Sequence, residues 1–195
     1  MPRPVRERSI LDVAGRVFAD AGYDRASMDR IAKLAGVSKP MLYAYFGSKE
    51  GLYVAYVKRT GGELVRRLVE ADSSDQGVRL RLVIDEFLCF VEQHRDGWTV
   101  LYRELTTRRP LAEQVAQVRA RIVADVRRML EGYGSDGFSE LRAPASEGVA
   151  EAIVGAGESL ANWWLGRPDV ARDDVAEWYA GLTRAAITAA NQAPG

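Results

Sequence analysis

The sequence predicts an all-α protein of about nine helices, and three kinds of observation support that prediction. Apolar residues recur at three- and four-residue spacing, the period of one helix face, along almost the whole chain. Serines that can cap a helix N-terminus alternate with glycines that can end a helix. No stretch of the sequence alternates apolar and polar residues as a half-buried strand would.

The composition predicts a folded protein and disfavours several other classes of protein. Of 195 residues, 47% are hydrophobic and 28% charged, which is typical of a folded chain rather than a disordered one. With one cysteine, Cys89, and one histidine, His94, we expect no internal disulfide, no metal and no cofactor. Asp12 interrupts the segment where a secretion signal would be apolar, and no apolar run is long enough for a membrane span. We therefore expect a cytoplasmic protein with no membrane partner.

The formal net charge of zero hides an asymmetry between the two ends of the chain. Residues 1–60 hold 11 Lys and Arg against 6 Asp and Glu, a net charge of +5. From totals of 27 each, residues 61–195 are left with 16 against 21, a net charge of −5. A basic N-terminal part suggests an anionic partner, and chance placement of surface charge is the alternative.

The first helices can be placed from their apolar stripes and caps. Segment 6–21 carries one apolar stripe, and Gly22 follows where that helix would end. A second helix is predicted over 28–35, with Ser27 as its N-cap. Asp29 falls in its first turn, where a carboxylate interacts favourably with the helix dipole.

Two further serines mark the next two helices. Ser38 can cap a short helix over 39–45, and Pro40 lies in its first turn, where a missing N–H costs nothing. Ser48 can cap a long helix over 49–71, and the free N–H groups at its start could hold a phosphate.

Beyond residue 71 fewer residues mark where helices begin and end, and the predicted helices are longer. They are predicted over 76–95, 97–107, 111–132, 146–165 and 170–191. We expect two domains, an N-terminal three-helix domain over 1–50 and a second helical domain over 51–195.

Residues 28–45 carry the most specific local pattern, that of a helix-turn-helix. Gly36 supplies a residue that tolerates positive φ in a tight turn between crossing helices. Ala32, four residues earlier, lets the helices approach closely, and Leu42, six residues later, can be buried against the crossing. Short helix pairs with alanine and glycine also arise by chance, so the pattern alone is moderately specific.

The residues that follow make the pattern more specific. Segment 36–53 reads GVSKPMLYAYFGSKEGLY. The matching residues before it are Phe18, Gly22, Tyr23, Ser27, Met28, Ile31, Ala32 and Ala35. Over about residues 6–55 the chain closely resembles the DNA-binding domain of the tetracycline-repressor (TetR) family. That resemblance implies a ligand-responsive transcriptional regulator, by default a repressor, that binds a palindromic operator in double-stranded DNA as a dimer. It also implies that domain 1–50 binds DNA and that domain 51–195 binds the ligand and forms the dimer.

In such a domain, helix 39–45 would lie in the major groove with its N-terminal residues at the base edges. Lys39 could donate to guanine, and the apolar neighbours could contact a thymine methyl group. The residues predicted at base edges are Lys39, Pro40, Met41 and Ala44, with Tyr43 at a base or a phosphate. The residues predicted at phosphates are Ser27, Tyr45 and Lys49, supported by Arg3, Arg6 and Arg25.

Each of these assignments has a structural alternative. The two tyrosines could pack against neighbouring helices, the two lysines could be solvated, and Ser27 could serve only as a cap. Arg3 and Arg6 could belong to a disordered tail. At 40–41, Pro-Met replaces the small or hydroxylated residues that are usual in the family, which leaves the operator sequence open.

A short recognition helix reads few base pairs, so a two-fold dimer is expected on two half-sites. Helices 146–165 and 170–191 carry broad apolar faces, and the first is rich in small residues that permit close helix approach. As in the TetR family, these two helices of each subunit would form a four-helix interface. The alternative is the ordinary core of a monomer.

The middle helices could enclose an apolar pocket for an unidentified small-molecule effector. The candidate lining residues are Phe87, Phe90, Val91, His94, Trp98, Tyr102, Ile122, Val126 and Trp163. Each could equally be part of an ordinary core, and the histidine could lie at a surface.

The sequence leaves two other functions to be considered. A helical enzyme is disfavoured because the sequence has no nucleophile–base pattern, no metal-ligand spacing and no glycine-rich phosphate loop. A DNA-binding regulator that senses no small molecule would need a C-terminal part that is all core.

Overall fold

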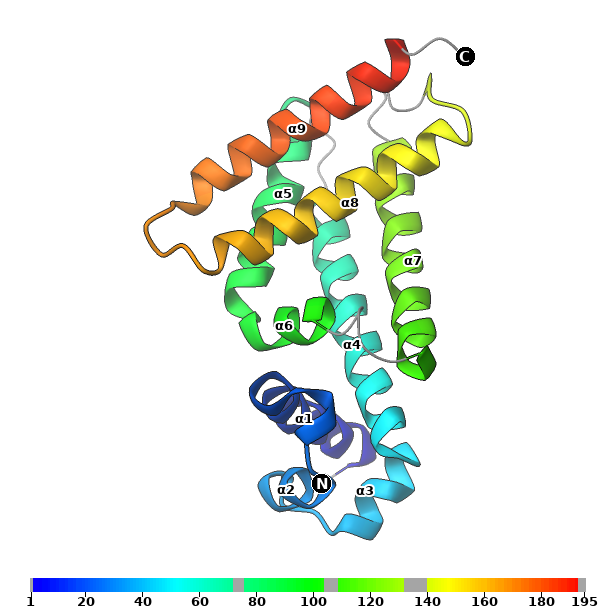
Figure 1. Ribbon diagram of the computed structural model, residues 1–195, viewed down its shortest axis with the longest axis vertical. Coiled ribbons are helices and arrows are strands. Elements are labelled where there is room, and N and C mark those ends of the chain that lie inside the picture. Colours follow the sequence, from blue (N-terminus) through cyan, green and yellow to red (C-terminus); the bar gives the residue numbers. More distant parts are fainter. Residues whose placement is uncertain (1, 72–75, 104–108, 132–139, 193–195) are drawn as a thin grey trace. The chain divides into compact units, whose positions relative to one another are not determined.

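The structure is a computed structural model that describes residues 2–71, 76–103, 109–131 and 140–192. All regular structure in these ranges is helical, which confirms the predicted all-α class (Figure 1). The helices are α1 (Arg3–Arg25), α2 (Met28–Ala35), α3 (Lys39–Phe46), α4 (Lys49–Ala71), α5 (Gln76–Gln93), α6 (Arg95–Arg103), α7 (Arg109–Glu131), α8 (Ala145–Trp164) and α9 (Arg172–Gln192). None of them combines the length and the apolar character that a membrane span requires.

The chain forms two compact units. The first comprises Met1–Gly62 and His94–Val118, and the second comprises Glu63–Gln93 and Arg119–Gly195. Helices α4 and α7 therefore contribute to both units. The predicted division at residue 50 concerns which part binds DNA and which binds ligand, and it stays a prediction.

The first unit is built around one apolar core. Helix α1 packs against α2 and α6, and α2 packs against α3. Side chains that are completely buried in this core include Ile10, Ile31, Leu42, Leu52 and Val57. Helices as short as α2 and α3 are marginal in isolation, so this burial is what stabilises them.

An aromatic cluster joins α1 to α4 in that core. The Tyr53 ring packs edge-on against Phe18 and Tyr23, with centroids 5.0 and 5.3 Å apart. Its hydroxyl donates a 3.0 Å hydrogen bond to the carbonyl oxygen of Val100 in α6. Tyr53 thus ties three helices of the first unit together.

The turns of the first unit follow the predicted chemistry. Gly22 has φ +71° and interrupts α1, and Gly36 ends α2 in the left-handed region with φ +65°. The N–H of Val37 then donates 3.0 Å to the carbonyl of Ala32. The predicted role of both glycines is confirmed, because a side chain is strained at these φ values.

The predicted serine caps also form. The Ser27 hydroxyl accepts from the N–H of Arg30 at 3.4 Å, and the Ser38 hydroxyl accepts from Met41 at 3.3 Å. Each satisfies one of the N–H groups left unpaired at a helix start.

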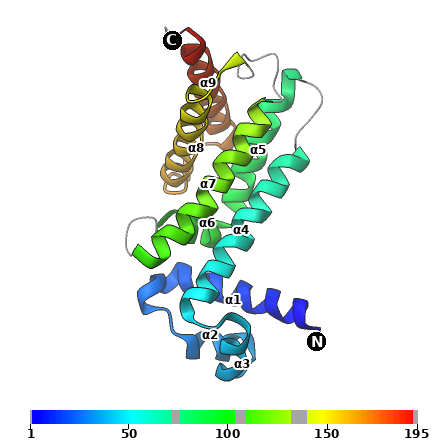
Figure 2. The ribbon, with the colours of Figure 1, turned by 90° about the vertical axis from the view of Figure 1, so that its right-hand side faces the viewer.

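In the second unit, helix α9 packs along α8 and against α5 (Figures 1 and 2). Its core includes Leu88, Ala150, Val175, Ala180 and Ile187. Ion pairs border this core. Arg81 of α5 bonds Asp173 and Glu177 of α9, and Arg119 of α7 bonds Glu151 and Glu158 of α8.

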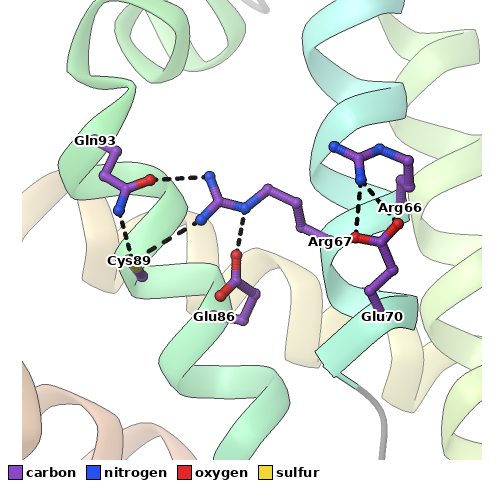
Figure 3. A network of polar contacts seen from close by, with 6 residues as sticks. All are labelled: Arg66, Arg67, Glu70, Glu86, Cys89 and Gln93. Carbon is purple, nitrogen blue, oxygen red and sulfur yellow. Dashed lines mark hydrogen bonds and ion pairs between the residues drawn. The ribbon is translucent and has the colours of Figure 1, made fainter.

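A polar network joins the second-unit part of α4 to α5 (Figure 3). The Arg67 guanidinium pairs with Glu86 and donates 3.1 Å to Gln93. The Gln93 amide lies 3.1 Å from the sulfur of Cys89, and the guanidinium also lies 5.6 Å from the centre of the Phe90 ring. The Arg67 guanidinium also lies 3.9 Å from the Cys89 sulfur, so the single cysteine is part of a helix-to-helix contact.

Candidate nucleic-acid interface

Helices α2 and α3 form the corner that the sequence predicted (Figure 2). On α3, the side chains of Lys39, Pro40, Tyr43 and Ala44 are exposed, and Tyr43 retains 42% of its accessible surface. Leu42 is completely buried in the first-unit core. One apolar anchor therefore holds a helix whose other side faces solvent.

Met41 and Tyr45 lie at the edge of that exposed surface and are half-buried. They contact the first turns of α1. The Arg3 guanidinium carbon lies 5.3 Å from the centre of the Tyr45 ring, and the Arg6 guanidinium lies 4.0 Å from the Met41 sulfur. Both arginines belong to a helix rather than to a disordered tail, and they add positive charge beside α3.

The start of α3 carries an ion pair that was not predicted from the sequence. The Lys39 ammonium lies 2.9 Å from the Asp29 carboxylate in the first turn of α2. This hydrogen bond and the charge of Asp29 raise the pKa of Lys39. Lys39 is thus a protonated donor whose position is set by a carboxylate on the same surface.

The predicted phosphate contacts Ser27 and Lys49 already have partners within the protein. Ser27 caps α2, and the Lys49 ammonium donates 3.0 Å to the carbonyl of Asp24. The same ammonium lies 4.6 Å from the centre of the Tyr23 ring. Any contact that Lys49 makes with a phosphate would compete with these two interactions.

The start of α4 is occupied by a carboxylate. A hydrogen bond from Tyr23, together with bonds from its own backbone N–H and from Ser48, lowers the pKa of Glu50. The N–H of Gly51 donates 3.0 Å to the Ser48 hydroxyl. The negative charge of Glu50 therefore disfavours the phosphate that was predicted at this helix start.

This arrangement predicts a pH-dependent stability. The pKa of Glu50 is lower in the folded state than in the unfolded state, so the ionised carboxylate stabilises the fold. Its contribution to the free energy of unfolding is complete above the unfolded pKa of about 4.5 and is lost as pH falls through the folded-state pKa. Glu50→Gln should lower the free energy of unfolding at pH 7 by less than about 1 kcal/mol, since the group is exposed.

Urea unfolding of wild type and Glu50→Gln at pH 7 and pH 3 measures this difference. The difference should be smaller at the lower pH, where more of the Glu50 carboxylate is protonated. In a Tyr23→Phe background, which lacks the first hydrogen-bond donor, the difference at pH 7 should shrink. A difference that is the same at both pH values would contradict this account.

The residues predicted to line an effector pocket are divided between the two units. In the second unit, Phe90 and Val91 are completely buried, whereas Phe87, Ile122 and Val126 are half-buried. The Phe87 ring lies 6.1 Å from the ring of Tyr179, centre to centre. Phe90 and Val91 belong to the core, and Phe87 and Val126 pack against it. The pocket that these residues were predicted to line stays a prediction.

The remaining pocket candidates have different surroundings. In the first unit, Trp98 is buried and His94 is half-buried, while the side chain of Tyr102 lies outside the described residues. In the second unit, Trp163 is 40% exposed, and its ring lies 6.3 Å from that of Trp178 on α9. Trp163 is thus at the surface of its own unit.

Two family models match the chain. The model described as bacterial regulatory proteins, tetR family, matches residues 10–56, which contain the α2–α3 corner. The model of the tetracyclin repressor-like C-terminal domain matches residues 76–186. Both describe transcriptional regulators rather than enzymes, so the rival interpretation as a helical enzyme is dropped.

Relatives and solved structures agree with these matches. The transcriptional activator FasR of Mycolicibacterium smegmatis is 33% identical over 167 residues, covering 85% of this chain and 74% of the relative. A TetR-like regulator from Rhodococcus sp. RHA1 is 34% identical with a TM-score of 0.73, covering 94% and 96% of the two chains.

A third likeness concerns the fold alone. The regulator FadR of Bacillus subtilis in complex with stearoyl-CoA is 21% identical with a TM-score of 0.75, covering 92% of this chain and 98% of that one.

The family models, the relative from M. smegmatis and the α2–α3 corner support the same conclusion. The chain belongs to the TetR family of bacterial transcriptional regulators.

Proposed function

We propose that this regulator binds a palindromic operator as a homodimer, with α3 in the major groove, and that a small-molecule effector releases it. The observation that carries the proposal is the exposed surface of α3 around its buried anchor Leu42. A capped helix with solvent-facing N-terminal residues has the geometry that a recognition helix needs.

The contacts follow from the chemistry of that surface. Lys39 would donate to guanine O6 or N7, and Pro40, Met41 and Ala44 would contact thymine methyl groups. Tyr43 would reach a base or a phosphate. The residues proposed at phosphates are Ser27, Tyr45 and Lys49, with Arg3 and Arg6 of α1 alongside.

Helices α8 and α9 are proposed as the dimer interface. They lie side by side in the second unit and expose large apolar side chains (Figure 1). Trp163, Trp178 and Leu182 retain 40%, 48% and 55% of their accessible surface, and the two tryptophan rings adjoin. Clustered apolar side chains of this size support an interaction surface. A two-fold dimer would place two recognition helices about 34 Å apart, one turn of DNA.

The effector is proposed to be an apolar small molecule, because the candidate lining residues are mostly aromatic or aliphatic. The stearoyl-CoA bound by the B. subtilis protein of similar fold has a long apolar acyl chain, which supports a ligand with an apolar part. Effector binding would favour the dimers whose DNA-binding helices are wrongly spaced for the operator. It can do so only if its affinity for those dimers is higher.

Repression is proposed as the sign of regulation, since a dimer on promoter DNA excludes RNA polymerase. Activation is the second candidate, and the name of the M. smegmatis relative, a transcriptional activator, favours it. In vitro transcription from the bound promoter separates the two, because addition of protein lowers transcript yield in the first case and raises it in the second.

The DNA-binding proposal is tested by fluorescence anisotropy on an inverted repeat from the DNA that flanks the coding region. Lys39→Ala and Tyr43→Ala should each lower operator affinity by roughly 10- to 100-fold, the cost of losing one base contact. Lys58→Ala, at an exposed lysine in the first-unit part of α4, is the matched control and should have little effect.

Circular dichroism must show that each variant keeps the helical content of the wild type. Operator binding that survives both Lys39→Ala and Tyr43→Ala unaltered would overturn the assignment of α3 as the recognition helix.

A further inference from the structure

The ion pair between Asp29 and Lys39 is placed where a DNA-binding surface would be expected to avoid a carboxylate. It joins the first turns of α2 and α3 at 2.9 Å, and the two side chains are 70% and 46% exposed. Both helix starts already have serine caps, and an ion pair this exposed adds little to stability. The fold therefore gives no strong reason for the carboxylate.

The Asp29 carboxylate lies on a surface that also carries positively charged groups. Arg3 and Arg6 of α1 contact Tyr45 and Met41 of α3, so the edge of this surface is basic. A carboxylate beside Lys39 on this surface repels the phosphates of any DNA, whatever its sequence. It also competes with those phosphates for the Lys39 ammonium.

We infer that Asp29 is a specificity-determining residue that weakens binding to non-operator DNA by holding Lys39. The inference rests on the proposed operator binding. In a non-specific complex, attraction to phosphates supplies essentially all of the affinity, so a lysine paired with Asp29 contributes one phosphate contact fewer. The charge of Asp29 adds repulsion.

The operator complex does not need to break this pair. An ammonium has three donor hydrogens, and one bond to Asp29 leaves two for guanine O6 and N7. Asp29 then orients Lys39 toward a base edge and keeps it from pairing with a phosphate of the DNA backbone. The pair thus penalises non-specific binding more than operator binding.

A purely structural role makes a different prediction. As an acidic residue in the first turn of α2, Asp29 also interacts favourably with the helix dipole. If that were its whole contribution, Asp29→Asn would lower stability and weaken binding to both kinds of DNA together. The salt dependence would then stay as in the wild type.

The test measures the Kd of wild type and Asp29→Asn for the operator and for an unrelated duplex of equal length, from 50 to 200 mM salt. For the unrelated duplex, we expect about threefold tighter binding and a plot of log K against log salt that is steeper by about 0.9, one phosphate contact. Operator affinity should change less, so the ratio of the two affinities should fall.

Two comparisons isolate the pair. Asp20→Asn breaks an exposed ion pair with Arg30 in the same unit, 3.4 Å long, and should leave both salt slopes unchanged. In a Lys39→Ala background, Asp29→Asn should no longer steepen the slope for the unrelated duplex. Asp29→Glu, which keeps the carboxylate, should behave as the wild type.

Different results would overturn the role of Asp29 and the proposed operator binding. An unchanged slope and affinity ratio in Asp29→Asn, or an equal loss of affinity for both duplexes, overturns the role of Asp29. A wild-type protein that does not distinguish the operator from the unrelated duplex instead overturns the proposed operator binding.

Discussion

Gly51→Ala is expected to destabilise the first unit by about 3 kcal/mol, the upper end of the usual cost of overpacking. Gly51 lies in the first turn of α4, directly after the turn that leaves α3. A Cβ at this position would overlap the carbonyl oxygen of Phe46 and lie 3.2 Å from its carbonyl carbon. The obstacle is backbone, which cannot rotate away as a side chain would.

The backbone between α3 and α4 is fixed by its own hydrogen bonds. Gly47, with φ +73° and ψ −49°, is the centre of a γ-turn in which the N–H of Ser48 donates 2.8 Å to the carbonyl of Phe46. The N–H of Gly47 donates 2.7 Å to the carbonyl of Tyr43. Moving the Phe46 carbonyl would break this turn and shift the end of α3, the proposed recognition helix, so operator affinity should fall as well.

Gly62→Ala is the matched control in the same helix. A Cβ there meets nothing within 4 Å, and alanine is the better helix former by about 0.5–1 kcal/mol. Urea unfolding should therefore show opposite signs for the two variants, and anisotropy should show weaker operator binding for Gly51→Ala alone. Equal stabilities of the two variants would contradict the clash.

The parts of the fold that depend on local chemistry were predictable from the sequence. Ser27 and Ser38 cap the helices they were assigned to, and Gly36 adopts the left-handed conformation that the tight turn requires. Leu42 is buried as the motif requires. In each case, the residues that decide the structure lie within a few positions of one another.

Contacts between distant segments were not predictable in this way. Lys39 and Asp29 belong to different helices, and their pairing depends on the angle at which α2 and α3 cross. Trp163 fits an apolar stripe whether it faces a pocket or a surface, and only the packing of α8 on α9 shows that it adjoins Trp178. A single chain also gives no signal for the Arg67–Glu86 pair, since the two residues lie on separate helices.

Gly157→Ala should destabilise the second unit by about 3 kcal/mol, from overpacking together with the loss of a buried hydrogen bond. A Cβ on Gly157 would overlap the hydroxyl oxygen of Tyr179 and lie 2.8 Å from its Cζ atom. Tyr179 is buried, and its hydroxyl donates 2.8 Å to the carbonyl of Ile153 on α8. Burial raises the pKa of Tyr179, so the hydroxyl stays a donor at neutral pH.

The ring cannot yield without leaving its own hydroxyl unpaired in the core, so α8 and α9 must move apart instead. Because these helices form the proposed dimer interface, Gly157→Ala should also dissociate at a higher protein concentration in analytical ultracentrifugation. Gly148→Ala is the control, because it lies in the first turn of α8 and nothing lies within 4 Å of the added Cβ. It should neither destabilise the second unit nor weaken the dimer. Adding Tyr179→Phe to Gly157→Ala removes the overlapping oxygen, so the double variant should recover part of the lost stability. Full stability of Gly157→Ala would mean that α8 and α9 pack less closely than the contact of Gly157 with Tyr179 requires.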